Sequence, residues 1–499
     1  MGKNSSRKNL LSHPLIWCFS TYFAEGFPYS IIRTVSSFFF RTMNVSLESI
    51  GLTSFFGLPW VLKFFWAPHI DRFVTKRWWL FVTQGVIAAL FLLCGLLIPF
   101  SWSVQAAAVI FMVGAIFAAT HDIAIDGYYL VSLSSEDQSR YVGFRVLAYR
   151  CALMVGSGIV ASVGAKLGWM HAFIAAGIVL GSLTIYHALY LPEHQTVKYS
   201  LRQFLCTVLN LRFIGAVIVF FLFVAILRTT VNSSIYNQLS RSFPLFKQLN
   251  FPAWVNIFLF GSLLVAALNR KKIKAGLLKN PQAYYTRAFT SFMDQQKIAV
   301  ILAFIIFLRT GEILLSNMVS PFMVDCGLKE HFGWLTALVG LPFSIAGALL
   351  GGFLIYRFSL KKMIFPFLFL QNGTNLLYMW LGFDLKEFIV INTNSAEPVF
   401  MGIFNLVKVA SVHGFDQLAG GLGTSVLMTF LMRLCKGEYK AAHYAIGSGL
   451  MNLSGIFGGA VSGLLASWMG YGWFFGFSFI AAIPAMVLVV PLMRNMTDV

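Results

Sequence analysis

A short basic motif occurs twice in this chain, each time in a loop between two long apolar runs. The first copy reads Arg72-Phe73-x-x-Lys76-Arg77, and the second reads Arg357-Phe358-x-x-Lys361-Lys362. A motif that returns at the same place in two long stretches of sequence indicates an internal repeat. The long apolar runs on either side indicate that the repeated unit is a bundle of membrane-spanning helices. The chain is therefore expected to contain one membrane bundle built twice.

Composition supports the membrane assignment and excludes a soluble protein. Hydrophobic residues make up 58% of the 499 positions, charged residues 11%, and the mean hydropathy is +0.76. The net charge of +19 accompanies no nucleic-acid-binding motif, so we assign the excess Lys and Arg to cytoplasmic loops and to contact with membrane lipid. The six cysteines are scattered and predict neither disulfides nor a metal site.

Apolar stretches long enough to span a bilayer divide the chain into three parts. Residues 1–194 form a first six-helix half, residues 298–499 form a second, and residues 195–297 carry an extra pair of spans, at 204–227 and 253–269, with a basic cytoplasmic loop. Parallel repeats of this kind are the architecture of major facilitator transporters. The prediction is an all-α polytopic membrane protein with about 14 transmembrane helices and both termini in the cytoplasm. The twelve core spans are expected at 14–40, 49–70, 78–100, 103–132, 142–165, 169–191, 298–322, 332–356, 362–382, 399–432, 441–467 and 472–493.

Acidic residues inside these spans are the best map of function, because charges in a bilayer are costly and are kept where they act. They fall in the first, fourth, seventh and tenth core helices, which line the central path in major facilitator folds. Asp122 and Asp126 are one turn apart, and a carboxylate pair in a low-dielectric cavity is expected to take up and release a proton reversibly. We predict that proton coupling involves Glu25, Asp122, Asp126, Glu312 and Asp416.

Basic and aromatic residues in the same spans predict an anionic or zwitterionic small-molecule substrate, because guanidinium groups bind carboxylates and phosphates at two points. Arg309 and Glu312, like His413 and Asp416, have the spacing of a helical pair. The predicted substrate-binding residues are Glu25, Arg33, His121, Tyr149, Arg150, Arg309 and His413. Arg145 lies near the cytoplasmic end, where it can pair with the 136–137 loop or the Asp71-Arg72 turn. The predicted gating residues are Asp71, Arg72, Arg145 and Arg357.

Several longer stretches resemble the AmpG-type muropeptide permeases, a major facilitator branch that also contains acetyl-coenzyme A transporters. The resemblance lies in the run from Leu62 to Arg72, the run from His121 to Gly127, the Tyr149-Arg150 pair and the run from Gly420 to Thr424. It implies import of N-acetylglucosamine linked to anhydro-N-acetylmuramic acid, with or without a peptide, driven by protons across a bacterial inner membrane. It also implies an extra helix pair between the halves.

Two other functions remain open on the sequence. One is transport of acetyl-coenzyme A or another anionic metabolite, with Arg33, Arg150 and Arg309 as phosphate contacts. The other is a membrane-bound acyltransferase using His121. The sequence has no phosphate-binding loop, zinc signature or nucleophile elbow, so we expect no enzyme activity, no metal and no cofactor.

Overall fold

A computed structural model gives the conformation of most of the chain. The structure describes residues 11–63, 66–67, 70, 74–193, 225–242, 284–295, 298–394, 401–434 and 440–493, together with residues 203, 222, 251, 253–255, 257–258, 261, 265, 269, 272 and 275–276. All regular elements in these residues are helical, which confirms the predicted all-α class.

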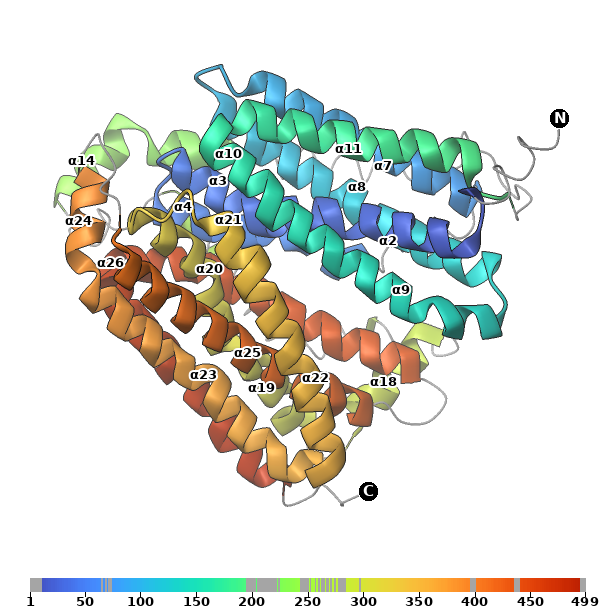
Figure 1. The fold of residues 1–499 in the computed structure, drawn as a ribbon. Helices are drawn as coiled ribbons and strands as arrows, with labels where there is room; N and C mark the ends of the chain where they lie inside the picture. The colour runs from blue at the N-terminus through green and yellow to red at the C-terminus, as the bar shows by residue number, and fades with distance from the viewer. Residues whose placement is uncertain are drawn as a thin grey trace. The chain divides into compact units, whose positions relative to one another are not determined.

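The first half of the chain folds into helices where its six core spans were predicted (Figure 1). The first and fifth core spans each contain a short π-helical turn. The second core span consists of two short α-helices joined by a 3₁₀ segment. The elements are α2 (Pro14–Ser30), η1 (Ile31–Val35), α3 (Ser36–Thr42), α4 (Leu47–Gly51), η2 (Leu52–Gly57), α5 (Leu58–Leu62), α7 (Lys76–Leu97), α8 (Ser103–Ser132), α9 (Ser135–Met154), η4 (Val155–Val160), α10 (Ala161–Leu167) and α11 (Trp169–Tyr190).

The second half repeats this arrangement, with one additional short helix, α24. Its last two predicted spans are two helices that meet at a kink at Gly470 (φ 73°, ψ 160°), and together they are labelled α26. The elements are α19 (Ile298–Leu308), α20 (Thr310–Asp325), α21 (Phe332–Trp334), η5 (Leu335–Gly340), α22 (Leu341–Phe358), α23 (Leu360–Asp384), α24 (Lys386–Asn394), α25 (Ile403–Leu434) and α26 (Lys440–Met493).

Between the halves, the structure describes the short helices α14 (Ser234–Ser242) and α18 (Tyr284–Met293). Most of the predicted extra spans, 204–227 and 253–269, lies outside the described residues. Within the described part of the chain, seven helices are long and apolar enough to cross a membrane. The predicted total of about 14 therefore stays a prediction.

The backbone carries the internal repeat that the sequence motif predicts. In the described residues, six positions have a positive φ angle, and they fall in corresponding connections of the two halves. Val74 (φ 60°) and Ser359 (φ 73°) occupy equivalent places in the repeated basic motif, after the second and eighth core helices. The other pairs are Asn44 with Gly327 and Gly168 with Gly470. Residues other than glycine rarely adopt a positive φ angle, so its recurrence at corresponding positions supports duplication of one bundle.

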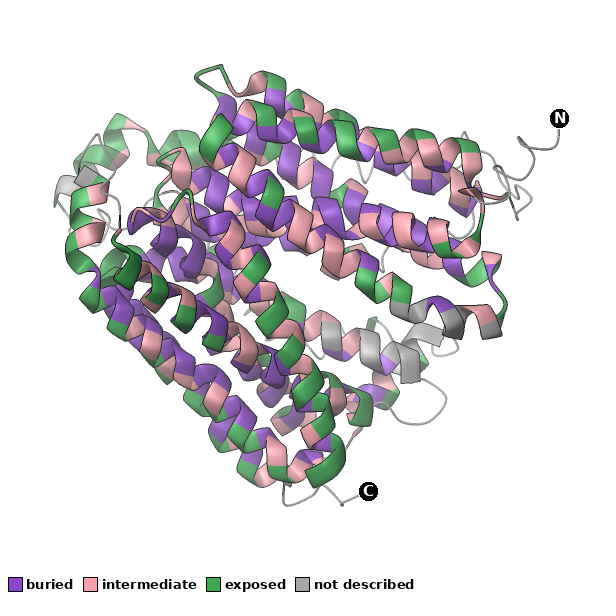
Figure 2. Cartoon of the chain, in the orientation of Figure 1, coloured by how far each residue is buried: buried purple, intermediate pink, exposed green. Residues whose placement is uncertain are grey.

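The chain divides into two compact units. One comprises Met1–Asn44, Phe56–Leu239 and Lys329–Ala337, and the other comprises Val45–Phe55, Ser240–Leu328 and Leu338–Val499. In the first unit α2 packs on α9 and α7 packs on α11, and in the second α20 and α23 both pack on α26. Figure 2 shows the buried residues of each helix on the sides that face its neighbours in the unit. The predicted division at residues 194 and 297 stays a prediction.

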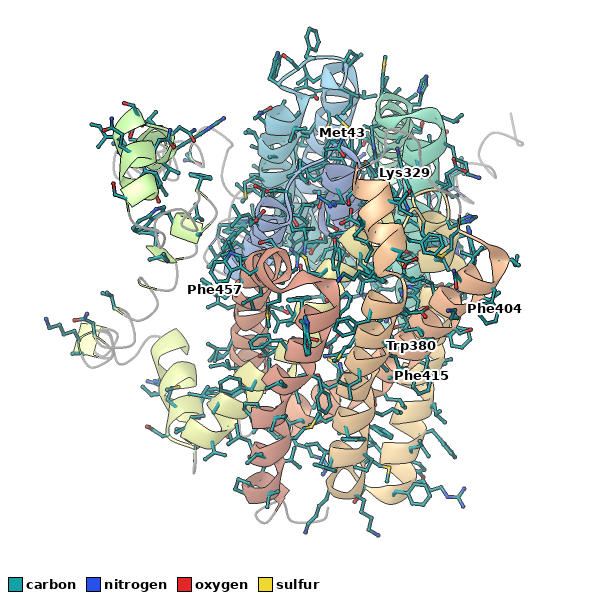
Figure 3. All side chains as sticks on the ribbon, turned by 90° about the vertical axis from the view of Figure 1, so that its left-hand side faces the viewer. Met43, Lys329, Trp380, Phe404, Phe415 and Phe457 are labelled. Atoms are coloured by element: carbon teal, nitrogen blue, oxygen red, sulfur yellow. The ribbon has the colours of Figure 1, made fainter. Side chains whose placement is uncertain are left out.

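Large apolar side chains also cover outer faces of these helices. Trp380 on α23 and Phe404 and Phe415 on α25 are exposed (Figure 3). In a helix that spans a bilayer such residues face lipid, so their exposure is consistent with a membrane protein.

Candidate functional site

Asp122 is the most buried acidic residue of a charged cluster in the first unit. It projects from α8 and is 7% exposed. Trp60 on α5 donates its indole N–H to Oδ2 at 2.8 Å, and the ammonium group of Lys63 lies 3.5 Å from the same oxygen. Lys63, the residue directly after α5, therefore pairs with an acid inside the unit.

Asp126 lies one turn further along α8 and has its own pair of donors. The Tyr22 hydroxyl on α2 donates to Oδ1 at 2.8 Å, and Arg145 on α9 forms a salt bridge to the same atom at 3.0 Å. The guanidinium also lies 4.4 Å from the centre of the Tyr22 ring. Arg145, a predicted gating residue, is thus paired with a predicted proton-coupling residue.

Glu25, on α2, is the third carboxylate of this cluster and has no such partner. Its Oε2 atom is buried and accepts no hydrogen bond from the described residues. Glu25 is close enough to both aspartates, Lys63 and Arg145 for their charges to act on it. The cluster therefore contains three carboxylates and two paired cations.

Tyr149 and Arg150 stand beside this cluster on α9. Tyr149 is close to Glu25, Asp122 and Arg150, and its ring contacts that of Tyr29 at 6.1 Å. Arg150 is partly buried and forms no salt bridge with any residue that the structure describes. Arg33 lies in the π-helical turn η1, and its guanidinium packs against Gly57, where a Cβ would lie 2.9 Å from Cζ.

A second polar cluster lies in the other unit and is centred on Glu312. Arg309 lies between α19 and α20, as the N-cap of α20. Its Nε and one terminal nitrogen donate to the two Glu312 oxygens at 2.7 Å each. The predicted pairing of these two residues is confirmed as a two-point salt bridge. Gln371 on α23 donates a third hydrogen bond, 2.8 Å long, to Oε2.

Asp416 and His413 on α25 bind different partners instead of each other. The Thr374 hydroxyl donates to Asp416 Oδ1 at 2.7 Å, and Tyr378 lies 3.0 Å from His413 Nδ1. Asp416 is near enough to Glu312 for their charges to interact. The spacing of His413 and Asp416 suits a pair, but α23 supplies both of them with closer partners.

The structure does not bring every predicted site residue into these clusters. His121 is fully buried beside Asp122, and neither of its ring nitrogens forms a hydrogen bond with the described residues. Arg357 is exposed at the end of α22, over the ring of Phe358. Asp71 and Arg72 lie outside the described residues. The prediction that all the charges meet at one cavity concerns both units together and stays a prediction.

Sequence reasoning missed the neutral partners of the acids. Trp60 and Tyr22 hold the aspartates, while Gln371 and Thr374 come from α23, the ninth core helix, which carries no acid in its middle. A signal for α23 is present, because polar residues recur along one apolar span at helical spacing: Gln371, Asn372, Thr374, Asn375 and Tyr378. In the part of the chain that the structure describes, no group of His, Cys, Asp or Glu could hold a metal ion.

Comparisons with known proteins identify the type of molecule. The family model of the Major Facilitator Superfamily matches residues 18–280. The anhydromuropeptide permease of Escherichia coli (strain K12) is 23% identical over 482 residues, covering 94% of this chain and 77% of the relative. An uncharacterized protein of Haemophilus influenzae is 24% identical over 508 residues, covering 99% and 98%. Putative transporter AmpG 1 of Rickettsia prowazekii is 21% identical, covering 96% and 97%.

Solved structures agree on the fold. The peptide transporter POT in complex with sulfate aligns with a TM-score of 0.66 at 12% identity, covering 97% of this chain and 96% of that one. The nucleoside transporter NupG aligns with a TM-score of 0.58 at 12% identity, covering 97% and 100%. The predicted resemblance to AmpG-type permeases is confirmed by the sequence relatives. The chain therefore belongs to the Major Facilitator Superfamily and is a multi-pass membrane transporter.

Proposed function

We propose that this transporter imports anhydromuropeptides, that is, N-acetylglucosamine linked to anhydro-N-acetylmuramic acid with or without a peptide, by proton symport. The E. coli relative is named for this class of substrate. The excess of Lys and Arg in the predicted inside loops supports cytoplasmic termini, and relatives in Escherichia, Haemophilus and Rickettsia support a bacterial inner membrane.

The observation that carries the substrate assignment is the unpaired guanidinium of Arg150. Lys63 and Arg145 already pair with Asp122 and Asp126, whereas Arg150 has no salt bridge in the described part of the chain. A partly buried cation in a spanning helix is costly unless an anion neutralises it. Arg150 is therefore assigned to a carboxylate of the substrate, which it would bind at two points.

The aspartate pair is assigned to the transported proton. Each aspartate accepts bonds from one neutral donor and one cation. Protonation of either carboxyl group would weaken its attraction to that cation and change how α5 or α9 is held on α8. Asp126 is the stronger candidate, because its side chain is 41% exposed whereas that of Asp122 is 10% exposed, so protons in water reach it more readily.

Binding of a labelled, peptide-free disaccharide to purified protein tests the assignment. Arg150→Lys should raise the apparent Kd for this disaccharide, whose muramyl part carries a carboxylate, by about tenfold or more. The reason is that a charged two-point contact is replaced by a single one. Arg228 is an exposed arginine outside the predicted site, so Arg228→Lys serves as the matched control and should bind as the wild type does. Unchanged binding to Arg150→Lys would refute the role of Arg150. Binding of acetyl-coenzyme A by a protein that does not bind the disaccharide would favour the alternative, transport of an anionic metabolite.

A further inference from the structure

Glu25 is the one carboxylate of the first cluster that the mechanism above leaves unused. Asp122 and Asp126 each have two donors, while the buried Oε2 atom of Glu25 accepts no hydrogen bond from the residues that the structure describes. Lys63 and Arg145 are nearby but are paired with the aspartates. An unpaired buried carboxylate is costly, so a cation or a proton must neutralise it.

The surroundings of Glu25 favour an organic cation. Tyr29 lies one turn further along α2. The centre of its ring is 5.2 Å from that of Trp60, in an edge-to-face arrangement, and 6.1 Å from that of Tyr149. Tyr149 lies close to Glu25. Aromatic faces attract ammonium groups, and a carboxylate beside them adds a charged hydrogen bond. A divalent metal ion would need several oxygen ligands, and no such group of ligands is present in the described residues.

The position of Tyr149 links this site to Arg150. Tyr149 lies near enough to Glu25 and to Arg150 for both charges to act on it. Glu25 is only partly buried as a residue, and the Arg145 side chain, whose charge acts on it, is 36% exposed, so solvent reaches part of this cluster. A negative and a positive group that flank one tyrosine, and that form no salt bridge with any described residue, suit a substrate that carries both an ammonium group and a carboxylate.

We propose that Glu25, with Tyr29 and Tyr149, binds a primary ammonium group of the substrate, so that peptide-bearing forms with a free amino group are selected. This rests on the proposed function, since it assumes that the peptide of a muropeptide reaches α2 and α9. The transported proton and the substrate ammonium group then use different carboxylates of one cluster.

Three ligands test the proposal on purified protein: the anhydro-disaccharide without peptide, the same disaccharide with a tripeptide ending in lysine, and that compound with the lysine side chain N-acetylated. The wild type should bind the free amine about tenfold or more tightly than the acetylated form, the range of a charged hydrogen bond. Glu25→Gln should reduce this ratio to near one. Glu48→Gln, at a partly exposed glutamate in the first turn of α4, is the control and should keep it.

An equal Kd for the two peptide forms in the wild type would overturn the proposal, as would a ratio that survives Glu25→Gln, since Glu25 then holds only a proton. If none of the three glycans binds, the proposed function fails, and the ammonium site is then tested separately. Thermal stabilisation of the wild type by phenethylammonium, lost in Glu25→Gln and absent with N-acetylphenethylamine, would support the site. Lack of stabilisation by phenethylammonium would overturn it.

Discussion

Gln371 shows how a neutral residue fixes a charged one. Its amide nitrogen donates to Glu312, which Arg309 already holds at two points, and its amide group occupies the space beside Gly423. A Cβ at position 423 would overlap the Gln371 side chain. Gly423 is therefore needed for Gln371 to reach Glu312.

We expect Gly423→Ala to act by displacing Gln371. The variant should lower the free energy of unfolding by roughly 1–3 kcal/mol, the cost of a lost hydrogen bond to a buried charged group. Gln371→Ala should cost a similar amount, and the double variant should cost no more than either single one, because both remove the same interaction. Thermal unfolding of the three purified variants measures this. Additive losses would show that Gly423 and Gln371 act independently.

The sequence predicted the acids of the site better than their partners. Glu25, Asp122, Asp126, Glu312 and Asp416 all lie within helices where they were expected, because a charge in an apolar span is conspicuous. Partners such as Trp60 and Thr374 are not conspicuous, since aromatic and hydroxyl residues are common in membrane helices. Which acid pairs with which base depends on the packing of helices, and spacing within one helix does not report it.

At the scale of elements, α4 and α26 pack through their backbones. A Cβ on Gly463 would overlap the Leu47 carbonyl, and a Cβ on Gly51 would lie 2.8 Å from the Ala460 carbonyl oxygen. Ser54 also donates a 2.8 Å hydrogen bond to the Ile456 carbonyl. Small residues at such contacts let helices approach closely in membranes.

Two glycine-to-alanine changes in spanning helices should therefore have opposite effects. Gly463→Ala should destabilise the protein by roughly 1–3 kcal/mol, because its methyl group meets backbone that cannot swing away. Gly352→Ala on α22 has no atom within 4 Å of its new Cβ and should be neutral or stabilising by up to about 1 kcal/mol through helix propensity. The unfolding temperatures of the two variants provide the comparison. Equal effects would contradict the close contact between α4 and α26.

Helix bounds were largely predictable, whereas helix irregularities were not. The core spans appear close to their expected positions, because apolar runs of this length have few alternatives in a membrane. The π-helical turns η1, η4 and η5 have no marker in the sequence. The break between α19 and α20 at Arg309 was also not predicted, since the sequence indicates one apolar span there.

The whole molecule combines a duplicated fold with a polar cluster in each unit. The positive φ angles in corresponding connections show the duplication in the backbone, and the family match places it among major facilitators. Among the described residues the two clusters differ: the first has two separate ion pairs and a Glu25 that forms no salt bridge, and the second has one two-point pair with hydrogen-bonded Asp416. This difference favours coupling chemistry in the first unit.

The most direct test of the account is uptake of labelled anhydro-disaccharide by vesicles, with and without an inward proton gradient, for the wild type and Asp126→Asn. The wild type should accumulate substrate only with the gradient. Asp126→Asn should still exchange labelled for unlabelled substrate but should lose accumulation, since the carboxyl group that carries the proton is gone. Asp294→Asn, at an exposed aspartate just after α18, should accumulate normally. Accumulation by Asp126→Asn at the wild-type rate and level would show that the Asp126 carboxyl group does not carry the transported proton.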